Sequence, residues 1–326
     1  MVSVDVQRLK APFPWFGGKT RAASLIWERF GNVPNYVEPF AGSMATLLQR
    51  PHAPGVETIN DRDTYVANFW RTLEHDPEAV AYYADSPVNE ADLHARHLWL
   101  VQQVDFRERM LTDPDFYNAK IAGWWVWGIC CWIGSGWCDV KKYERNKNTR
   151  PDLSAAGRGI HRKLIHLGDA GRGINRQLPH LGNAGRGIVD YFYALADRLR
   201  RVRVCCGDWM RVLGPSVTEK HGVTGILLDP PYSGETGRDR ELYSQEDLEV
   251  SARVREWAIV NGDNPRLRVA LCGYDGEHDM PASWTCETWK AGGGYDGQNL
   301  DRDNQRRALE RIWFSPACIQ PASLFS

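Results

Sequence analysis

An apolar run that ends in an acid and two prolines constrains the fold of this chain more than any other stretch. Residues 225–228 are apolar and lead directly into Asp229-Pro230-Pro231-Tyr232. Such a run is typical of a buried strand in an α/β sheet. Proline cannot continue a strand or a helix, so the chain must leave the sheet here as a stiff loop. The motif fits a plain rigid turn, but ligands of open α/β sheets also bind at the carboxyl ends of strands.

The residue types in this motif suit one kind of chemistry. The amino group of a nucleobase is a poor nucleophile because its lone pair is delocalised into the ring. Two oxygen acceptors, one for each N–H, favour the pyramidal geometry in which that lone pair can attack. Asp229 and the carbonyl of Pro230 can supply the acceptors, Pro231 holds them rigid, and Tyr232 can stack on the base. The motif resembles the catalytic motif of amino-methylating DNA methyltransferases that use S-adenosylmethionine.

Three stretches nearer the N-terminus have the patterns of a cofactor site. Residues 12–19 contain two glycines, which allow a ligand to approach the backbone. Residues 35–43 predict a strand, a tight turn and a helix that starts near residue 43, with room for a cofactor carboxylate or amine beside the helix N-terminus. Residues 56–61 predict a strand that ends in an acid, a position that commonly accepts hydrogen bonds from ribose hydroxyls. Taken singly, the first two also fit ordinary turns and the third fits a helix cap.

The order of these stretches resembles the Dam-like, D12 class of adenine-N6-specific DNA methyltransferases. Members of that family open with an aromatic-Gly-Gly-Lys segment, continue with a Glu-Pro-Phe-x-Gly loop, and place their DNA-recognition region before the catalytic motif. The resemblance covers residues 12–70 and 202–315. The chain departs from the family at Pro14, where members often carry a lysine, so no DNA contact is assigned there.

The resemblance implies S-adenosylmethionine as the cofactor and assigns residues to two parts of the site. The implied catalytic residues are Asp229, Pro230, Pro231 and Tyr232. The implied cofactor-binding residues are Trp15, Phe16, Gly17, Gly18, Lys19, Glu38, Pro39, Phe40, Gly42, Ser43, Asp61, Asp208 and Trp209. Within this second set, Asp61 takes the ribose and Asp208 faces the adenine of the cofactor.

The predicted fold class is α/β, a Rossmann-like S-adenosylmethionine-dependent methyltransferase sheet with an inserted basic target-recognition region. Residues 1–70 and 202–326 are assigned to the catalytic domain, and residues 71–201 to the insertion. After the insertion, the patterns predict strands at residues 202–205, 267–274, 284–289 and 310–314, and a helix at residues 245–260. Tryptophans 124, 125, 127 and 132 lie too close together to face one side of a helix, so most are expected in the core.

The composition is that of an intracellular protein. The N-terminus has no apolar signal segment, and no apolar stretch reaches the length of a membrane span, so we expect a soluble, cytoplasmic protein. The eight cysteines form no Cys-x-x-Cys pair, and the pairs at 130–131 and 205–206 lie in apolar runs. They are predicted to be buried, reduced thiols. His94 and His97 have helical spacing but no companion ligands nearby, so no metal site is predicted.

Positive charge is concentrated in one part of the chain. Residues 140–203 hold 15 Lys and Arg against 5 Asp and Glu, whereas the rest holds 25 against 36. Within this part, residues 153–190 contain a 14-residue repeat with Ala-Gly-Arg-Gly-Ile in each copy. A basic block usually marks a surface for a polyanion, and its alternative is a solvated charged face. The predicted DNA-binding residues are Lys141, Lys142, Arg145, Arg150, Arg158, Arg162, Arg172, Arg176, Arg186 and Arg238.

These patterns together predict methyl transfer from S-adenosylmethionine to adenine N6 in double-stranded DNA, by a site-specific or a nonspecific enzyme. The target adenine must be flipped out, because its amino group cannot meet the methyl group inside the base stack. One alternative is an amino methyltransferase that acts on RNA or on protein glutamine. Glutamine-directed relatives usually carry Asn-Pro-Pro-Tyr, so Asp229 counts against them. The other alternative is a DNA-binding protein with a degenerate catalytic fold, against which the intact acid and tyrosine count.

The repeat generates a testable hypothesis, that Arg158, Arg172 and Arg186 hold the DNA backbone at a regular spacing. Glycines beside each arginine let the chain approach phosphates, which arginine binds in bidentate fashion. Because phosphate contacts carry no sequence information, the triple alanine variant should bind every duplex more weakly and keep the same methylation pattern. Its log–log salt slope should be shallower by roughly 2–3. An unchanged slope would favour a solvated segment or a subunit contact, unless the methylation pattern changes, in which case the repeat reads bases.

Overall fold

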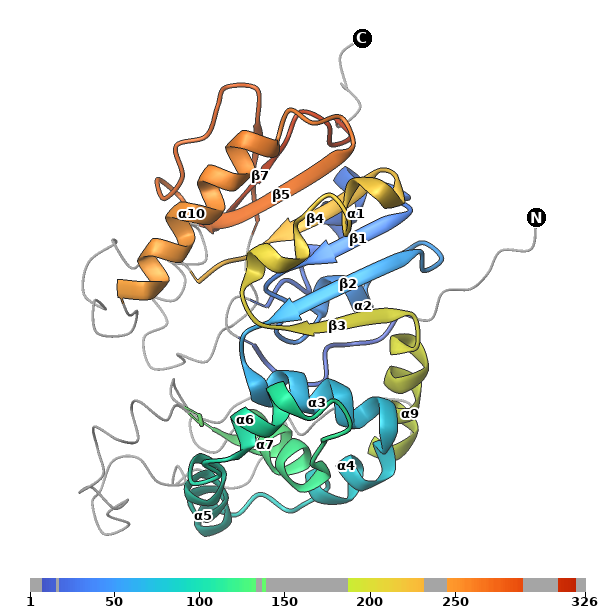
Figure 1. Cartoon of the computed structure of the whole chain (residues 1–326), viewed down its shortest axis with the longest axis vertical. Helices are drawn as coiled ribbons and strands as arrows, with labels where there is room; N and C mark the ends of the chain where they lie inside the picture. The colour runs from blue at the N-terminus through green and yellow to red at the C-terminus, as the bar shows by residue number, and fades with distance from the viewer. Residues whose placement is uncertain are drawn as a thin grey trace.

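One mixed sheet organises the chain. The computed structural model describes residues 8–15, 18–132, 137–138, 187–231, 245–289 and 310–320. Within these residues, the strands form a single sheet in the order β3-β2-β1-β4-β5-β7-β6 (Figure 1). The strands are β1 Asn35–Glu38, β2 Val56–Asp61, β3 Val202–Cys206, β4 Thr224–Leu228, β5 Leu267–Tyr274, β6 Thr285–Thr288 and β7 Glu310–Phe314.

The pairing directions confirm the predicted fold class. Strands β1 to β5 pair in parallel, whereas β7 runs antiparallel to both β5 and β6. The strand order reverses between β1 and β4, which creates a topological switch point in the middle of the sheet. The arrangement is that of a Rossmann-like methyltransferase sheet. Residues 139–186, which carry most of the basic region, lie outside the described residues, so the basic insertion stays a prediction.

The predicted strands agree closely with the observed ones. Strands β5 and β7 have the predicted bounds, and β3 extends one residue beyond them. The strand expected at 284–289 is slightly shorter, and the helix expected at 245–260 is α10. The helix expected near residue 43 is only the four-residue α2, which starts after Met44, a residue with a left-handed backbone conformation.

Most of the helices lie between β2 and β3 in the sequence. The helices are α1 Ala23–Phe30, α2 Ala45–Leu48, α3 Thr64–His75, α4 Pro77–Ala84, α5 Glu90–Val101, α6 Phe106–Thr112, α7 Ala119–Cys131, α9 Ile188–Leu199 and α10 Gln245–Asn261, with short 3₁₀ turns η1 Trp209–Val212 and η2 Glu219–His221. Asp63, Asp76, Asn89 and Asn118 each precede a helix and accept a hydrogen bond from a backbone N–H of its first turn. These caps satisfy donors that the helix cannot satisfy itself, which explains where α3, α4, α5 and α7 begin.

Helices cover both faces of the sheet and extend beyond its β3 edge. Neighbouring residues Tyr36 and Val37 of β1 belong to different apolar clusters, because successive side chains of a strand point to opposite faces. One cluster contains α1, α2 and α3, and the other contains α10 and Trp209. Helices α3 to α7 and α9 gather together beyond β3 (Figure 1).

Aromatic side chains join this helical group to the rest of the protein. The Phe13 ring lies 5.4 Å from that of Phe69 and 4.9 Å from that of Trp125, and Phe69 lies 5.8 Å from Phe192. These rings come from the N-terminal segment, α3, α7 and α9. The tryptophans of α7 follow the expectation, since Trp125 and the neighbouring tryptophan 127 are fully buried and the other two pack partly against core clusters. The division at residues 70 and 201 stays a prediction, but helices on both sides of residue 70 share one core.

The cysteine prediction is correct at one pair and wrong at the other. Cys130 and Cys131 in α7 are buried free thiols, as expected. Cys205 and Cys206 are also free but only half-buried. They lie in β3, which is the edge strand of the sheet and has a neighbour on one side only. Among the described helices, none is long and apolar enough to cross a membrane.

A buried charge triad joins α9 to the sheet. The Glu57 carboxylate of β2 is fully buried and pairs with Arg50 at 3.1 Å and with Arg198 at 2.6 Å. Arg50 also donates to the carbonyl of Val33, and its guanidinium lies 5.1 Å from the ring centroid of Trp27. Since a buried ion requires a partner, the triad holds α9, β2 and the chain after α2 in one arrangement.

We predict that Glu57→Gln destabilises the protein by about 3–5 kcal/mol, because it leaves two buried guanidinium groups without a carboxylate. The matched control is Asp197→Asn, which makes the same chemical change in an exposed pair with Arg200 on α9. The control should change stability by no more than about 0.5 kcal/mol. Urea unfolding at pH 7 measures both. Equal effects of the two variants would contradict a structural role for the triad.

Candidate active site at the carboxyl edge of the sheet

The two motifs that the sequence singles out leave the sheet side by side. Strands β1 and β4 are parallel neighbours, with Val37 opposite Ile226. Glu38-Pro39 therefore ends β1 next to the point where Asp229-Pro230 follows β4. Both lie at the topological switch point, where open α/β sheets bind their ligands. Pro230 is buried and Pro231 is exposed, so the loop turns outward from the sheet edge.

A buried lysine holds the acid of the Asp-Pro-Pro motif. The Lys19 ammonium lies 2.9 Å from Asp229 Oδ1 and 3.9 Å from Glu310 Oε2. It also lies 5.3 Å from the ring centroid of Trp289. Burial by itself lowers the pKa of Lys19, but the carboxylates, Asp229 first, raise it well above its usual value. Lys19 is therefore a permanent cation, and by the same interaction it stabilises the carboxylate form of Asp229.

Glu38 lies in the same cluster but in a different electrostatic state. Its side chain is buried and accepts a hydrogen bond from the Tyr36 hydroxyl at 3.0 Å. Burial raises the pKa of Glu38 to about 8, and the charge of Asp229 adds to this. The Tyr36 hydroxyl, the Leu47 N–H and Lys19 lower the pKa and only partly offset the burial. The carboxyl group of Glu38 therefore takes up a proton more readily than an ordinary glutamate.

Asp61, at the end of β2, anchors the loop that follows β1. Its Oδ2 accepts from the Gly42 N–H at 2.9 Å, and its Oδ1 accepts from the Asp63 N–H at 2.9 Å. Burial, followed by the charge of Asp63, raises the pKa of Asp61 to about 6. The cap of α3 is Asp63 and not Asp61, so the alternative interpretation of Asp61 as a helix cap is wrong. Each Asp61 oxygen keeps a second lone pair, so the carboxylate can still accept from a ligand.

The neighbouring residue, Asn60, joins two loops of the sheet edge. Its amide donates to the Pro39 carbonyl and to the Gly207 carbonyl, both at 3.0 Å. It thereby ties the loop after β1 to the loop after β3. These bonds hold the two loops together at the carboxyl edge.

Gly42 is required by the close approach of Trp15. Its backbone has φ +46°, in the left-handed region, and a Cβ atom built there would lie 2.3 Å from the Trp15 indole. The Gly42 carbonyl also accepts from the indole N–H of Trp70 at 3.3 Å. Of the other residues in this loop, Ser43 is buried and Phe40 is half-buried. The aromatic N-terminal segment and the loop after β1 thus interlock.

The loop after β3 supplies an aromatic surface. Trp209 is buried and stacks on Phe40, with ring centroids 6.0 Å apart and an interplanar angle of 28°. Its indole N–H has no hydrogen-bond partner among the described residues. Asp208 is exposed, and its carboxylate accepts from the Met210 N–H at 2.9 Å. Asp208 therefore caps η1 and holds Trp209 at the sheet edge.

The rest of the predicted site is only partly described. Gly18 is exposed beside the buried Lys19. Phe16, Gly17 and Tyr232 lie outside the described residues. So do all the predicted DNA-binding residues, Lys141, Lys142, Arg145, Arg150, Arg158, Arg162, Arg172, Arg176, Arg186 and Arg238.

Four residues of the cluster were missed in the sequence. Glu310 and Trp289 approach Lys19, Tyr36 donates to Glu38, and Cys272 is a buried thiol among these charges. Burial, and next the charge of Asp229, raise the pKa of Cys272 well above its usual value, so it is a neutral thiol. The sequence held one signal for this cluster, the acidic residue Glu310 at the start of the last predicted strand. That signal could be used only with the strand order, which brings the start of β7 to Lys19.

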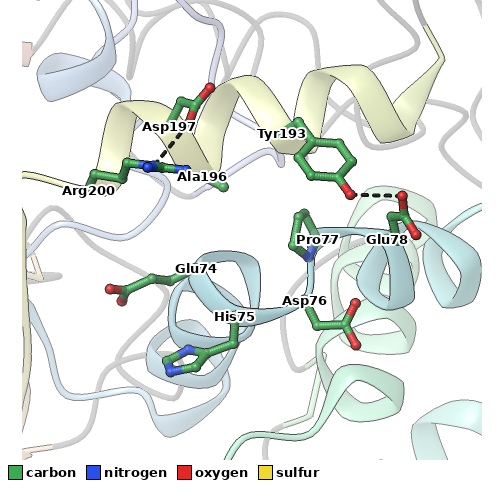
Figure 2. Close-up of a pocket in the computed structure, with 9 residues that line it drawn as sticks. All are labelled: Glu74, His75, Asp76, Pro77, Glu78, Tyr193, Ala196, Asp197 and Arg200. Atoms are coloured by element: carbon green, nitrogen blue, oxygen red, sulfur yellow. Dashed lines mark hydrogen bonds and ion pairs between the residues drawn. The ribbon is translucent and has the colours of Figure 1, made fainter.

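A polar pocket of about 430 Å³ lies at another place, between α3, α4 and α9 (Figure 2). It is lined by Glu74, His75, Asp76, Pro77, Glu78, Tyr193, Ala196, Asp197 and Arg200. Two of its contacts are internal, from Tyr193 to Glu78 at 2.8 Å and from Arg200 to Asp197 at 3.0 Å. The pocket adjoins the end of α3, whereas the candidate active site adjoins its start, so the two are separate.

A comparison with protein families tests the resemblance to the D12 class of DNA methyltransferases. The family of D12 class N6 adenine-specific DNA methyltransferases matches residues 15–112. The resemblance to this family is confirmed, and the D12 match includes Trp15, Lys19, β1, β2 and Asp61. It supports methylation of adenine N6 in DNA in general. The match ends at residue 112 and does not include Asp229. Asp229 is placed beside the matched segment because β4 pairs with β1 in the sheet. No curated protein matches the chain.

We predict that Lys19→Met destabilises the protein by about 3–5 kcal/mol at pH 8, because it removes the buried cation that pairs with the Asp229 and Glu310 carboxylates. The loss should be smaller at pH 5.5, where these carboxyl groups take up protons more readily. Urea unfolding at the two pH values measures the difference. Lys220→Met, at an exposed lysine, is the control and should show little effect at either pH. Equal losses for Lys19→Met at both pH values would mean that Lys19 contributes packing alone.

Proposed function

We propose that this protein transfers a methyl group from S-adenosylmethionine to the N6 amino group of adenine in double-stranded DNA. The single observation that carries the proposal is the position of Asp229. Its carboxylate is mostly buried, paired with Lys19 at 2.9 Å, and set at the switch point beside the loop after β1. The D12 match to the cofactor-side half of this edge supports the same reaction.

The residues at the sheet edge fit the proposed cofactor. The lack of a Cβ atom at Gly42 lets the Trp15 indole lie directly against the loop after β1, so an aromatic ring borders the place of the cofactor. Asp61 retains acceptor capacity for ribose hydroxyls, and the buried Trp209 offers an apolar surface and an unused N–H donor. Glu38 lies where a cation can approach a carboxyl group. When bound, S-adenosylmethionine supplies a methyl group on a positively charged sulfur.

The chain itself prepares the nucleophile. The Asp229 carboxylate and the Pro230 carbonyl each accept one N–H of the target amino group, which directs its lone pair away from the ring. The negative charge of Asp229 also stabilises the positive charge that develops on the nitrogen as it attacks. Lys19 holds Asp229 in the acceptor form, and the rigid diproline fixes its position. The rate enhancement arises mainly from positioning, so no covalent nucleophile of the chain is required.

Access of the base to this edge requires that the adenine leave the duplex. Its amino group cannot reach the carboxyl edge of the sheet from inside the base stack. In the proposal, Tyr232 stacks on the flipped base, and the basic residues between 140 and 203 hold the DNA backbone. The positive charge of that region supports this part, since phosphate contacts supply most of the affinity that does not depend on sequence.

We predict that Asp229→Ala lowers the rate of methyl transfer to DNA by on the order of 10²–10³, because one preorganised acceptor is lost. Cofactor binding should largely remain. Transfer of labelled methyl from S-adenosylmethionine measures the rate, nucleoside mass spectrometry identifies the product, and calorimetry measures binding. The control is Asp263→Ala, at an exposed acid beyond α10, which should keep the parent rate. A rate for Asp229→Ala within about tenfold of the parent would show that the assigned role is wrong.

A further inference from the structure

Three carboxyl groups and one ammonium group meet at the carboxyl edge of the sheet. Glu38, Asp229 and Glu310 surround Lys19, and all four side chains are mostly buried. Among the described residues, Glu38 is the acid of this cluster that makes no ion pair, so an ionised Glu38 would be a buried charge without a cation in contact. Burying an uncompensated charge is costly, and proteins usually avoid it by leaving the group protonated.

The contacts single out Glu38 as the acid that holds the proton. Lys19 lies within 4 Å of Asp229 and Glu310, whereas Glu38 has no ion pair among the described residues. Glu38 instead contacts the Tyr36 hydroxyl of its own strand at 3.0 Å. The groups that face it from other elements are the Leu47 N–H of α2, Lys19, Asp229 and the Cys272 thiol of β5. Burial raises the pKa of Glu38 to about 8, in agreement with this geometry.

We propose that Glu38 holds a proton in the cofactor-free protein and releases it to solvent when S-adenosylmethionine binds. The inference rests on the proposed function and adds a coupling between cofactor binding and proton release. The cofactor carries an ammonium and a sulfonium group, and Glu38 directly precedes the loop that the cofactor would contact. A nearby positive charge favours the ionised carboxyl group. The O–H bond of the carboxyl group breaks, its electron pair stays on Glu38, and the proton passes to the buffer.

The coupling has a definite sign. Below about pH 8 the proton competes with the cofactor, so affinity should fall about tenfold for each pH unit as the pH decreases. Above that pH the affinity should level off. An α-amino group ordinarily titrates at about 7.7–8.0. At pH 6.5 the cofactor amine is therefore already charged and takes up no proton on binding, and the comparison with Glu38→Gln tells whether the released proton comes from Glu38.

Calorimetry of the full-length chain with S-adenosylmethionine tests the proposal. Titrations at pH 6.5 in phosphate and in imidazole, which differ in ionisation enthalpy, give the number of protons released. We expect about one proton per cofactor for the parent and none for Glu38→Gln. The matched control is Glu28→Gln, at an exposed acid on α1, which should release the same proton as the parent.

A second variant keeps the test independent of how well Glu38→Gln folds. Tyr36→Phe removes a hydroxyl group that lowers the pKa of Glu38. The pH at which affinity levels off should therefore move upward, and proton release at pH 6.5 should persist. A purely structural role of Tyr36 would weaken binding equally at every pH.

The outcomes separate this inference from the proposed function. Cofactor binding without proton release would overturn the inference and leave the function standing. Release that persists in folded Glu38→Gln would assign the proton to another group and also overturn it. If the folded parent binds no S-adenosylmethionine at any pH, the proposed function itself fails, and the inference fails with it.

Discussion

The buried ion pair between Lys19 and Asp229 is the interaction on which the candidate site depends. It connects a residue before α1 to the loop after β4, and Glu310 at the start of β7 completes it. Taking these charges out of water has a large free-energy cost, which only close pairing offsets. The three segments are therefore confined to one arrangement, and that arrangement puts a charged acceptor at the switch point of the sheet.

Hydrogen bonds around this pair hold the loops at the carboxyl edge of the sheet in place. Asp61 uses both carboxylate oxygens on backbone N–H groups, and Asn60 ties together the loops after β1 and β3. Trp15 packs against Gly42 so closely that no side chain fits there. A site held in this way loses little conformational entropy when a ligand binds. Electrostatic catalysis benefits in the same manner, because fixed dipoles need no reorganisation during the reaction.

The helical group beyond β3 holds the described residues on both sides of the stretch 139–186. On one side, the indole N–H of Trp137 donates to the Trp125 carbonyl of α7 at 3.0 Å. On the other, α9 is held by the pair of Arg198 with buried Glu57 and by the packing of Phe192 on Phe69. Residues on both sides of the stretch 139–186 therefore pack against the same sheet that carries the candidate site.

The sequence by itself determined the strands, the resemblance to the D12 family and the position of the motifs at the ends of strands. Apolar runs end abruptly at Glu38, Asp61 and Asp229, and such local signals depend only on the residues nearby. Only the tertiary structure decided the partners of these residues. Lys19 was assigned to the cofactor, yet the fold brings it to Asp229, 210 positions away in the chain. Cys272 and Glu310 join the cluster because β5 lies between β4 and β7, and Tyr36 joins it because β1 lies beside β4. The periodicity of a sequence tells which face of a strand is buried but not which strand lies beside it. The proposed proton on Glu38 depends on the groups that the neighbouring strands bring to it. The exposure of Cys205 has the same cause, since nothing in its apolar run shows that β3 is an edge strand.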